Sequence, residues 1–234
     1  MRYVVSDIHG EYELFVKLLD KIGFSDKDEM YICGDLIEKG RSSVKLLELV
    51  SAMPNIYCIQ GNHEFDFLSH YSCLMMRTES DFDGVLKRLQ ERFEYDGHLL
   101  TWELIDWIDS LPLFIEKEDF ICVHAGIPTD NDGKLVPLDE VDPVLLVYDR
   151  RFKTKEFMHN SEKCVFFGHT PTNAVCGDNR ILSYLRNEID NPRIIRDYYK
   201  IHLDTDAWQS GILGCFNVDT LEEVYVSETS GEEN

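Results

Sequence analysis

The sequence has 234 residues, of which 44% are hydrophobic and 29% are charged, as expected for a globular protein with one α/β domain. Its 44 acidic residues outnumber its 23 basic residues, so the formal net charge is −21. A field of this sign repels nucleic acid and anionic lipid, and we therefore expect neither as a partner.

The first residues lead directly into a strand pattern, which leaves no space for a secretion signal, and no apolar run approaches the roughly 18 residues of a membrane span. We therefore expect a cytoplasmic protein. The seven cysteines lie mostly within apolar runs and form no Cys-x-x-Cys pair. Neither a disulfide framework nor a structural zinc site is expected.

The N-terminal part alternates short apolar runs with amphipathic segments. Strands are predicted at residues 3–5, 30–33 and 56–59, with helical patterns at 14–22 and 42–53 between them. The strands recur about every 26 residues, and this spacing predicts a parallel sheet of right-handed βαβ units.

Each of these strands ends on residues that can bind a metal ion. Asp7 and His9 follow the first strand, Asp35 follows the second, and Asn62 and His63 follow the third. Because ligands bind at the carboxyl ends of strands in open α/β sheets, we expect these side chains to meet. Taken singly, each motif also fits a helix cap or a loop.

The pattern changes several times after residue 64. Residues 65–111 are predicted to form a helical excursion beside the site, residues 177–200 an inserted lobe, and residues 228–234 a disordered tail of a single domain spanning 1–234. A short helix is predicted at 139–147. Further strands are predicted at 113–115, 120–123 and 165–167, and then, as antiparallel strands, at 201–203, 212–218 and 224–226.

Two of the later strands also end on imidazoles, His124 and His169. Carboxylate, imidazole and amide ligands without thiolate favour Mn, Fe or Zn in a reactive site over structural zinc. The basic segment at 149–155, which contains Arg150, is either a solvated face or part of an anion site.

Taken together, the strand-end motifs resemble the signature blocks of the phosphoprotein-phosphatase branch of the calcineurin-like metallophosphoesterases, especially its short bacterial and phage-lambda-type members. In chain order they are Asp7-Ile8-His9-Gly10, Gly34-Asp35-Leu36-Ile37-Glu38-Lys39-Gly40, Gly61-Asn62-His63-Glu64, Val123-His124-Ala125-Gly126 and Gly168-His169-Thr170-Pro171. The resemblance implies an α/β fold, a β-sandwich with βαβ units flanked by helices, with a dinuclear metal site at the carboxyl ends of the strands.

By this resemblance the cofactors are two divalent metal ions, with Mn²⁺ expected and Fe, Zn or Ni as alternatives. One ion would be held by Asp7, His9 and Asp35, and the other by Asp35, Asn62, His124 and His169.

The resemblance also implies catalytic roles. A water molecule activated by the metal ions would attack phosphorus in line. His63 would protonate the departing oxygen, with Glu38 orienting it. Arg150 and Lys39 would offset charge on the phosphoryl oxygens.

Three positions depart from the family pattern. The second block normally ends Asp-Arg-Gly, whereas here Glu38 is a longer carboxylate and Lys39 places an ammonium where a guanidinium is expected. Lysine lacks the bidentate fork of arginine, so we expect looser phosphate orientation unless Arg41 or Arg150 compensates. Asp206 stands where the family has glycine.

We therefore expect an enzyme, a metal-dependent phosphomonoester hydrolase acting as a serine/threonine or dual-specificity protein phosphatase on phosphorylated protein or peptide. The alternative is a dinucleoside-polyphosphate (diadenosine tetraphosphate) hydrolase of the same superfamily, whose members usually read Gly-Asn-His-Asp where this chain has Glu64. A non-enzymatic phosphate-binding module is a third hypothesis, and His63 argues against it because pure binding needs no general acid. The sequence leaves the oligomeric state open.

Overall fold

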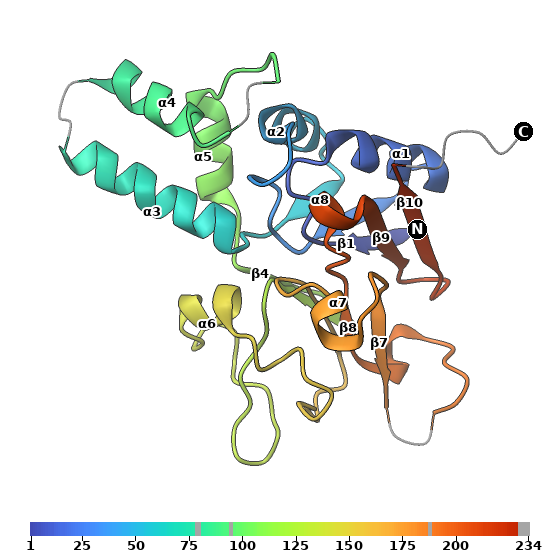
Figure 1. Cartoon of the computed structure of the whole chain (residues 1–234). Coiled ribbons are helices and arrows are strands. Elements are labelled where there is room, and N and C mark those ends of the chain that lie inside the picture. Colours follow the sequence, from blue (N-terminus) through green and yellow to red (C-terminus); the bar gives the residue numbers. More distant parts are fainter. Residues whose placement is uncertain (78–80, 94–95, 187–188, 229–234) are drawn as a thin grey trace, which may run out of the picture.

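A computed structural model describes residues 1–77, 81–93, 96–186 and 189–228 (Figure 1). Within them the strands form two mixed sheets, with orders β10-β9-β1-β2-β3 and β4-β5-β6-β8-β7. The strands of the first sheet are β1 (Arg2–Val5), β2 (Glu29–Ile32), β3 (Ile56–Cys58), β9 (Ile212–Asn217) and β10 (Glu223–Ser227). Those of the second are β4 (Phe114–Glu116), β5 (Phe120–Val123), β6 (Cys164–Phe167), β7 (Leu182–Leu185) and β8 (Tyr198–His202).

In the first sheet, β1, β2 and β3 are parallel, which confirms the predicted βαβ units. The crossovers are α1 (Tyr12–Ile22) and α2 (Ser43–Ser51). Helix α1 buries Leu14, Phe15 and Leu18, which recur at helical spacing on the face toward the sheet. Strands β9 and β10 extend the same sheet in antiparallel pairing, as predicted.

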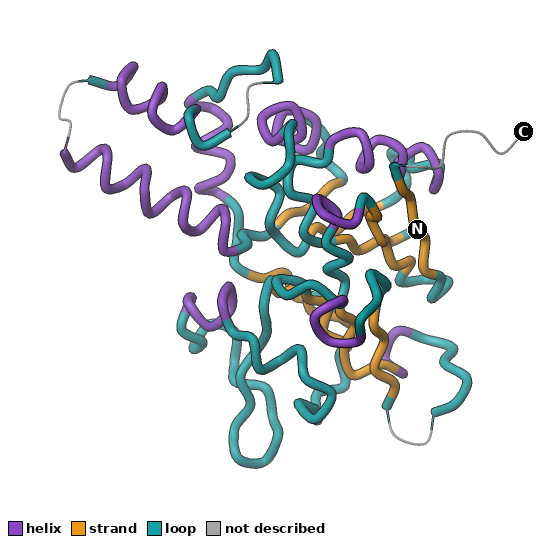
Figure 2. Tube along the Cα trace, in the orientation of Figure 1, coloured by secondary structure: helices purple, strands orange, loops and turns teal. Residues whose placement is uncertain are grey.

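In the second sheet, β5, β6 and β8 are parallel, and β4 and β7 are antiparallel edge strands. Residues 201–203 of β8 were expected to lie in an antiparallel strand. Strand β8 is antiparallel to β7 but parallel to β6, so the expectation is wrong for the pairing with β6. Part of the segment predicted as a lobe forms β7 and the start of β8. The sequence does not indicate these strands, because the many arginines of the segment hide the alternation typical of a strand. Long loops connect the strands of this sheet, as Figure 2 shows in its lower half.

The two sheets pack face to face as a sandwich. Val4 and Tyr31 of the first sheet and Phe120 and Phe166 of the second are buried together in the layer between them. The aromatic side chains there meet edge to face, with 5.2 Å between the ring centroids of Tyr31 and Phe120.

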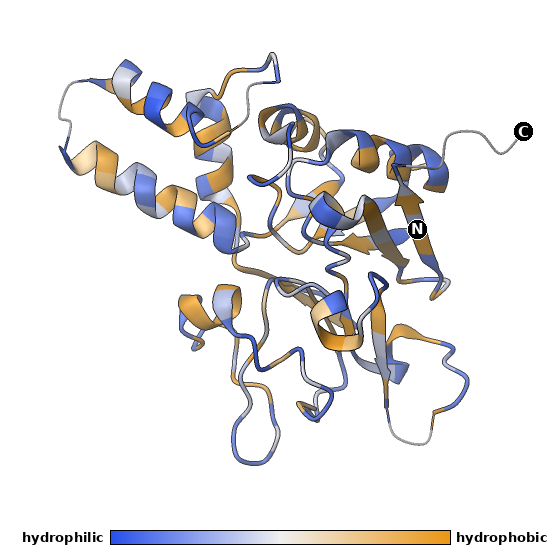
Figure 3. Ribbon diagram, viewed as in Figure 1, coloured by the Kyte–Doolittle hydropathy of each residue, from blue (hydrophilic) through white to orange (hydrophobic). Residues whose placement is uncertain are grey.

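A helical arm covers one flank and projects from the body of the molecule (Figure 1). It consists of α3 (Asn62–Arg77), α4 (Phe82–Gln90) and α5 (Trp102–Ser110), and α3 and α4 alternate hydrophobic and hydrophilic residues (Figure 3). The remaining helices are α6 (Pro143–Tyr148), α7 (Asn173–Cys176), α8 (Ala207–Ser210) and the 3₁₀ turn η1 (Ile195–Asp197).

Among the described residues, no helix is both long enough and apolar enough to cross a lipid bilayer. At the C-terminus the Glu228 amide donates a hydrogen bond to the Gly211 carbonyl at 3.0 Å. The rest of the predicted tail, 229–234, lies outside the described residues.

Candidate metal centre

The loops that follow β1 and β2 run side by side and continue the hydrogen-bond ladder beyond the strands. The amides of Asp7, His9 and Gly10 donate to the carbonyls of Gly34, Asp35 and Leu36 at 3.1, 2.9 and 2.7 Å. The second sheet joins this edge because the His169 amide donates to both carboxylate oxygens of Asp7, at 3.1 Å each.

Four of the predicted metal ligands have left-handed backbone conformations, with φ of 53° at Asp7, 49° at His9, 56° at Asp35 and 69° at His169. Such conformations are unfavourable for residues with a Cβ and persist where the surroundings determine them. Their concentration at one edge of the sandwich marks this edge as a functional site.

The metal-binding atoms form two clusters that share Asp35. Ligand atoms of His9, Asp35 and His63 lie within 4.8 Å of one another, and so do those of Asp7, Asp35 and His124. The sharing fits a bridging carboxylate. The clusters differ from the predicted sets in two respects, since Asp7 groups with His124, and His63, predicted as a catalyst only, lies among the ligand atoms.

Asn62 contacts the imidazoles of His124 and His169. Its Oδ1 atom is 3.0 Å from Nε2 of His124 and 2.8 Å from Nδ1 of His169. The structure therefore brings together all six residues that were predicted as metal ligands.

The donor set fits a cation. Nδ1 of His124 donates to the Cys33 carbonyl at 2.8 Å, and burial lowers the pKa of this imidazole, so Nε2 carries a lone pair. That lone pair faces Oδ1 of Asn62 at 3.0 Å and Oδ1 of Asp35 at 3.5 Å. Three acceptors that converge without a proton between them are satisfied by a metal ion.

The buried carboxyl groups of Asp7 and Asp204 also favour a bound cation. Burial raises the pKa of Asp7, and the neighbouring Asp204 and Asp35 raise it further. Burial also raises the pKa of Asp204 to about 7. Since like charges so close together destabilise one another, a divalent ion would stabilise this region.

Lys39 contacts the other cluster. Nδ1 of His9 donates to the Ile37 carbonyl at 3.1 Å, and its Nε2 accepts from the Lys39 ammonium at 2.8 Å. Burial lowers the pKa of His9 to about 4, which keeps the ring neutral. One lone pair cannot serve both a metal ion and Lys39, so binding of an ion at His9 frees the ammonium.

His63 is held by a chain of charged groups. Its Nδ1 is 2.6 Å from Glu38, whose other oxygen accepts from Arg92 at 2.7 Å. Although burial opposes it, the hydrogen bond to Glu38 raises the pKa of His63 above its usual value. Arg92 follows α4 in the arm, and no local pattern around it predicts this contact.

Of the other candidate cations, Arg150 is close enough to His169 to affect its pKa. Burial, His124 and the charge of Arg150 lower the pKa of His169 to about 3. Arg150 is exposed, while Asp149 binds Arg151, with 2.6 Å between Oδ2 and Nη2. Arg41 lines a separate cavity with Glu11.

Glu64 is fully buried and supports the loop that carries Asp35. Its carboxylate accepts from the amides of Asp35, Leu36, Ile37 and Gly61 at 2.8–3.2 Å. The Glu64 carboxylate therefore positions this loop and does not face the site of a substrate. A Cβ at Gly61 would come within 2.1 Å of Oδ1 of Asp35, which explains the glycine.

Two cations of residues 177–200 are bound by groups of the protein itself. Lys200 is fully buried, and its ammonium donates to the carbonyls of Phe152, Thr154 and Phe157 at 2.5–2.7 Å. Arg196 pairs with Glu118 at 3.3 Å. Lys200 thereby ties β8 to the loop that follows Arg150.

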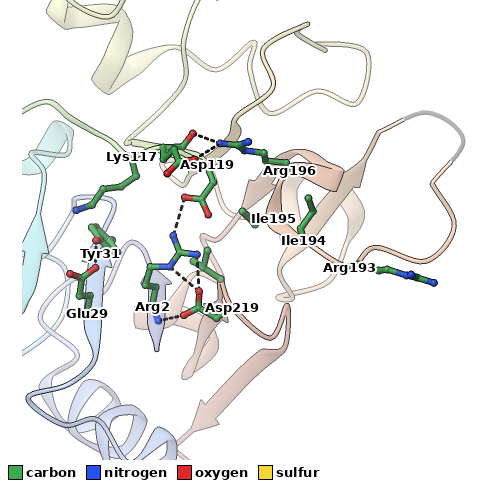
Figure 4. A pocket seen from close by; sticks show the side chains of 12 residues that line it. Arg2, Glu29, Tyr31, Lys117, Asp119, Arg193, Ile194, Ile195, Arg196 and Asp219 are labelled. Atoms are coloured by element: carbon green, nitrogen blue, oxygen red, sulfur yellow. Dashed lines mark hydrogen bonds and ion pairs between the residues drawn. The ribbon is translucent and has the colours of Figure 1, made fainter.

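A cavity of about 600 Å³ lies at the other end of the strands (Figure 4). Arg2 at its centre pairs with Asp119 at 2.9 Å and Asp219 at 2.7 Å. Since Arg2 begins β1 and Asp7 follows the end of this strand, the cavity is remote from the metal ligands.

Residues 2–203 match the family model for calcineurin-like phosphoesterases, and the chain belongs to this family of phosphoester hydrolases. Among curated relatives, the symmetrical bis(5'-nucleosyl)-tetraphosphatase of Aggregatibacter actinomycetemcomitans is 32% identical, over 61% of this chain and 51% of that protein. The enzyme of the same name from Buchnera aphidicola subsp. Acyrthosiphon pisum (strain 5A) is 32% identical, over 68% of this chain and 57% of that protein. The chain thus spans about half the length of the curated relatives it matches.

Solved structures share the fold. A proposed diadenosine tetraphosphatase superposes with a TM-score of 0.68 at 17% identity, covering 98% of this chain and 94% of that one. A serine/threonine phosphatase from Saccharomyces cerevisiae superposes with a TM-score of 0.58 at 13% identity, covering 99% and 81%.

These relatives correct the expected function. The predicted fold is confirmed, but the expectation of a protein phosphatase with phosphorylated protein or peptide as partner is contradicted, because the curated relatives at 32% identity are named tetraphosphatases. The strand-end motifs report metal binding, which is common to both kinds of enzyme, and so could not separate them.

Proposed function

We propose that this chain hydrolyses the polyphosphate bridge of dinucleoside polyphosphates, with diadenosine tetraphosphate as its model substrate. The observation that carries the proposal is Asp35, which belongs to both ligand clusters and fits a dinuclear site. The names of the curated relatives support a dinucleotide as the substrate.

We propose Asp7, His9, Asp35, Asn62, His124 and His169 as the ligands of two divalent ions, with Mn²⁺ as the activating metal. Bound ions would supply an activated water molecule and neutralise phosphoryl charge. All six proposed ligands lie at one edge of the sandwich. Backbone hydrogen bonds join the loops of Asp7, His9 and Asp35, His124 is bound to a backbone carbonyl, and Asn62 contacts both His124 and His169.

The chain's own cations and acids act on the substrate. Arg150 orients the phosphoryl group as a bidentate donor, and Lys39, once released from His9, adds a positive charge. As water forms a bond to phosphorus and the bridging bond to oxygen breaks, His63 donates its proton to the departing nucleoside diphosphate. Glu38 keeps His63 oriented and protonated.

The test is hydrolysis of diadenosine tetraphosphate by the Mn²⁺-loaded chain, with products separated by chromatography. Cleavage at the central bridge yields ADP alone, whereas cleavage beside it yields AMP and ATP. Asp35→Asn, purified in the same way, controls for contaminating enzymes. Hydrolysis of phosphopeptides with a higher kcat/KM than the dinucleotide, or no hydrolysis of the dinucleotide, would overturn the proposal.

A further inference from the structure

A second cavity, of about 370 Å³, adjoins the metal ligands. This volume lies within the range of about 300–1,000 Å³ typical of small-ligand sites. Its walls come from the loop after β2, from α7 and from α8, and α8 lies above α7 in Figure 1. Lys39 belongs both to this cavity and to the candidate metal centre, because its ammonium is 2.8 Å from Nε2 of His9.

The cavity presents an exposed indole. Trp208 of α8 is 39% exposed, and its ring centroid is 5.9 Å from the Lys39 ammonium. The preceding Ala207 is buried and anchors the helix. An aromatic face beside a cation suits a ligand with a planar ring and a phosphate, since rings stack on indole while the cation attracts the anion.

Two of the three departures from the family pattern, Lys39 and Asp206, line this cavity. Lys39 replaces an arginine and Asp206 replaces a glycine. Asp206 has φ of 58°, in the left-handed region that favours glycine, so the carboxylate is present despite the backbone conformation. Burial raises the pKa of Asp206, and the positive charge of Lys39 lowers it, so the two groups are close enough to interact.

The remaining polar groups are amides. Asn173 and Gln209 line the same cavity, and each offers one acceptor and two N–H donors. Together with Asp206 they supply the donors and acceptors that the edge of a nucleobase or the hydroxyls of a ribose require. A phosphopeptide side chain would use few of these groups.

We infer that this cavity binds the nucleoside of the substrate half next to the metal centre, with its base stacked on Trp208 and Asp206 accepting a hydrogen bond from the base or ribose. The inference rests on the proposed function, since it assigns the place of one nucleoside of a dinucleotide. It makes Trp208 a determinant of substrate specificity.

The test compares ADP with inorganic pyrophosphate by titration calorimetry on the Mn²⁺-loaded chain. Base stacking strengthens binding by about 5–150-fold, equivalent to about 1–3 kcal/mol. We expect ADP to bind more tightly than pyrophosphate by such a factor, Trp208→Ala to remove most of this preference, and Trp208→Phe to keep most of it. Phe82→Ala, at a 53% exposed aromatic residue of α4, is the control and should keep the preference.

The outcomes separate this inference from the proposed function. If the chain cleaves diadenosine tetraphosphate but binds ADP no more tightly than pyrophosphate, the cavity holds no nucleoside and the inference is wrong. If Trp208→Ala weakens both ligands equally, Trp208 acts only on the structure, and the inference is again wrong. A preference for ADP that depends on Trp208, in a chain that does not cleave the dinucleotide, would support the cavity and overturn the proposed function.

Discussion

Asp35 is the residue on which both ligand clusters depend, and its replacement is the most direct test of a dinuclear centre. Asn keeps the shape of the side chain but removes its charge, so Asp35→Asn should weaken both ions together. We expect metal content, measured by mass spectrometry after dialysis against Mn²⁺, to fall from about two ions per chain to less than one. Asp109→Asn, at an exposed carboxylate of α5, is the control, and retention of both ions by Asp35→Asn would contradict a shared ligand.

His63 lies among the candidate ligand atoms, yet its hydrogen bond to Glu38 raises its pKa and so favours a role as a general acid. We expect His63→Asn to lower kcat on an alkyl phosphate by about 10²–10⁴-fold with near-normal metal content. The loss should be smaller on diadenosine tetraphosphate, because ADP leaves more easily than an alkoxide. A variant that loses an ion and suffers equally on both substrates would make His63 a ligand.

At the scale of elements, the helical arm reaches the site through Arg92. Two of its nitrogens contact one Glu38 oxygen at 2.5 and 2.7 Å, which fixes the partner of His63. We expect Arg92→Ala to lower kcat by up to about 100-fold without changing metal content, since a displaced acid transfers its proton poorly.

Arg92→Lys keeps one charged hydrogen bond and should lose less activity. Arg88→Ala, at an exposed arginine in the last turn of α4 with a 3.9 Å contact to Asp81, is the matched control. Equal activity of Arg92→Ala and Arg88→Ala would show that Glu38 holds its position without the arm.

Lys200 links β8 to the loop after Arg150, and it should give stability a characteristic pH dependence. Burial lowers the pKa of Lys200 to about 7 from an ordinary 10.5, so between these pH values the unfolded chain holds a proton that the folded chain releases. The free energy of unfolding therefore rises with pH in this interval, by up to about 1.4 kcal/mol per pH unit from this group.

Lys200→Met removes this contribution and leaves three carbonyls without a donor. We expect lower stability at every pH and a flatter rise between pH 7 and 10 than in the unaltered chain, measured by urea unfolding. If the difference between the two proteins does not change over this interval, the three carbonyls keep the ammonium charged in the folded state.

The elements carrying the ligands could be predicted from the sequence because strand ends are a local pattern: Asp7, Asp35 and His124 each follow an apolar run. The partners of these residues could not. Arg92 is 54 positions from Glu38, and no periodicity in the arm distinguishes it from the other basic residues. The burial of Lys200 could not be predicted either, because the carbonyls that accept its hydrogen bonds belong to a loop distant in the sequence.

For the whole molecule, the charge of −21 opposes the approach of a polyphosphate. Raising ionic strength from about 0.01 to 0.1 M shortens the screening length from about 30 to 10 Å. We expect kcat/KM for diadenosine tetraphosphate to rise over this range at constant Mn²⁺, because salt screens the repulsion between the substrate and the net negative charge of the chain. A fall with salt would show that Arg150 and Lys39 dominate the field that the substrate meets.

The hydrogen bonds between the loops after β1 and β2 join backbone groups only. The Glu64 carboxylate adds to them by accepting from the amides of Asp35 and Leu36. None of these bonds requires a bound ion, so the order of the ligand loops is a property of the folded polypeptide itself. We therefore expect that a chelator removes bound ions without unfolding the chain, and that a different metal can be loaded into the same loops. Differences in activity between such reloaded forms would then belong to the metals and not to the protein's conformation.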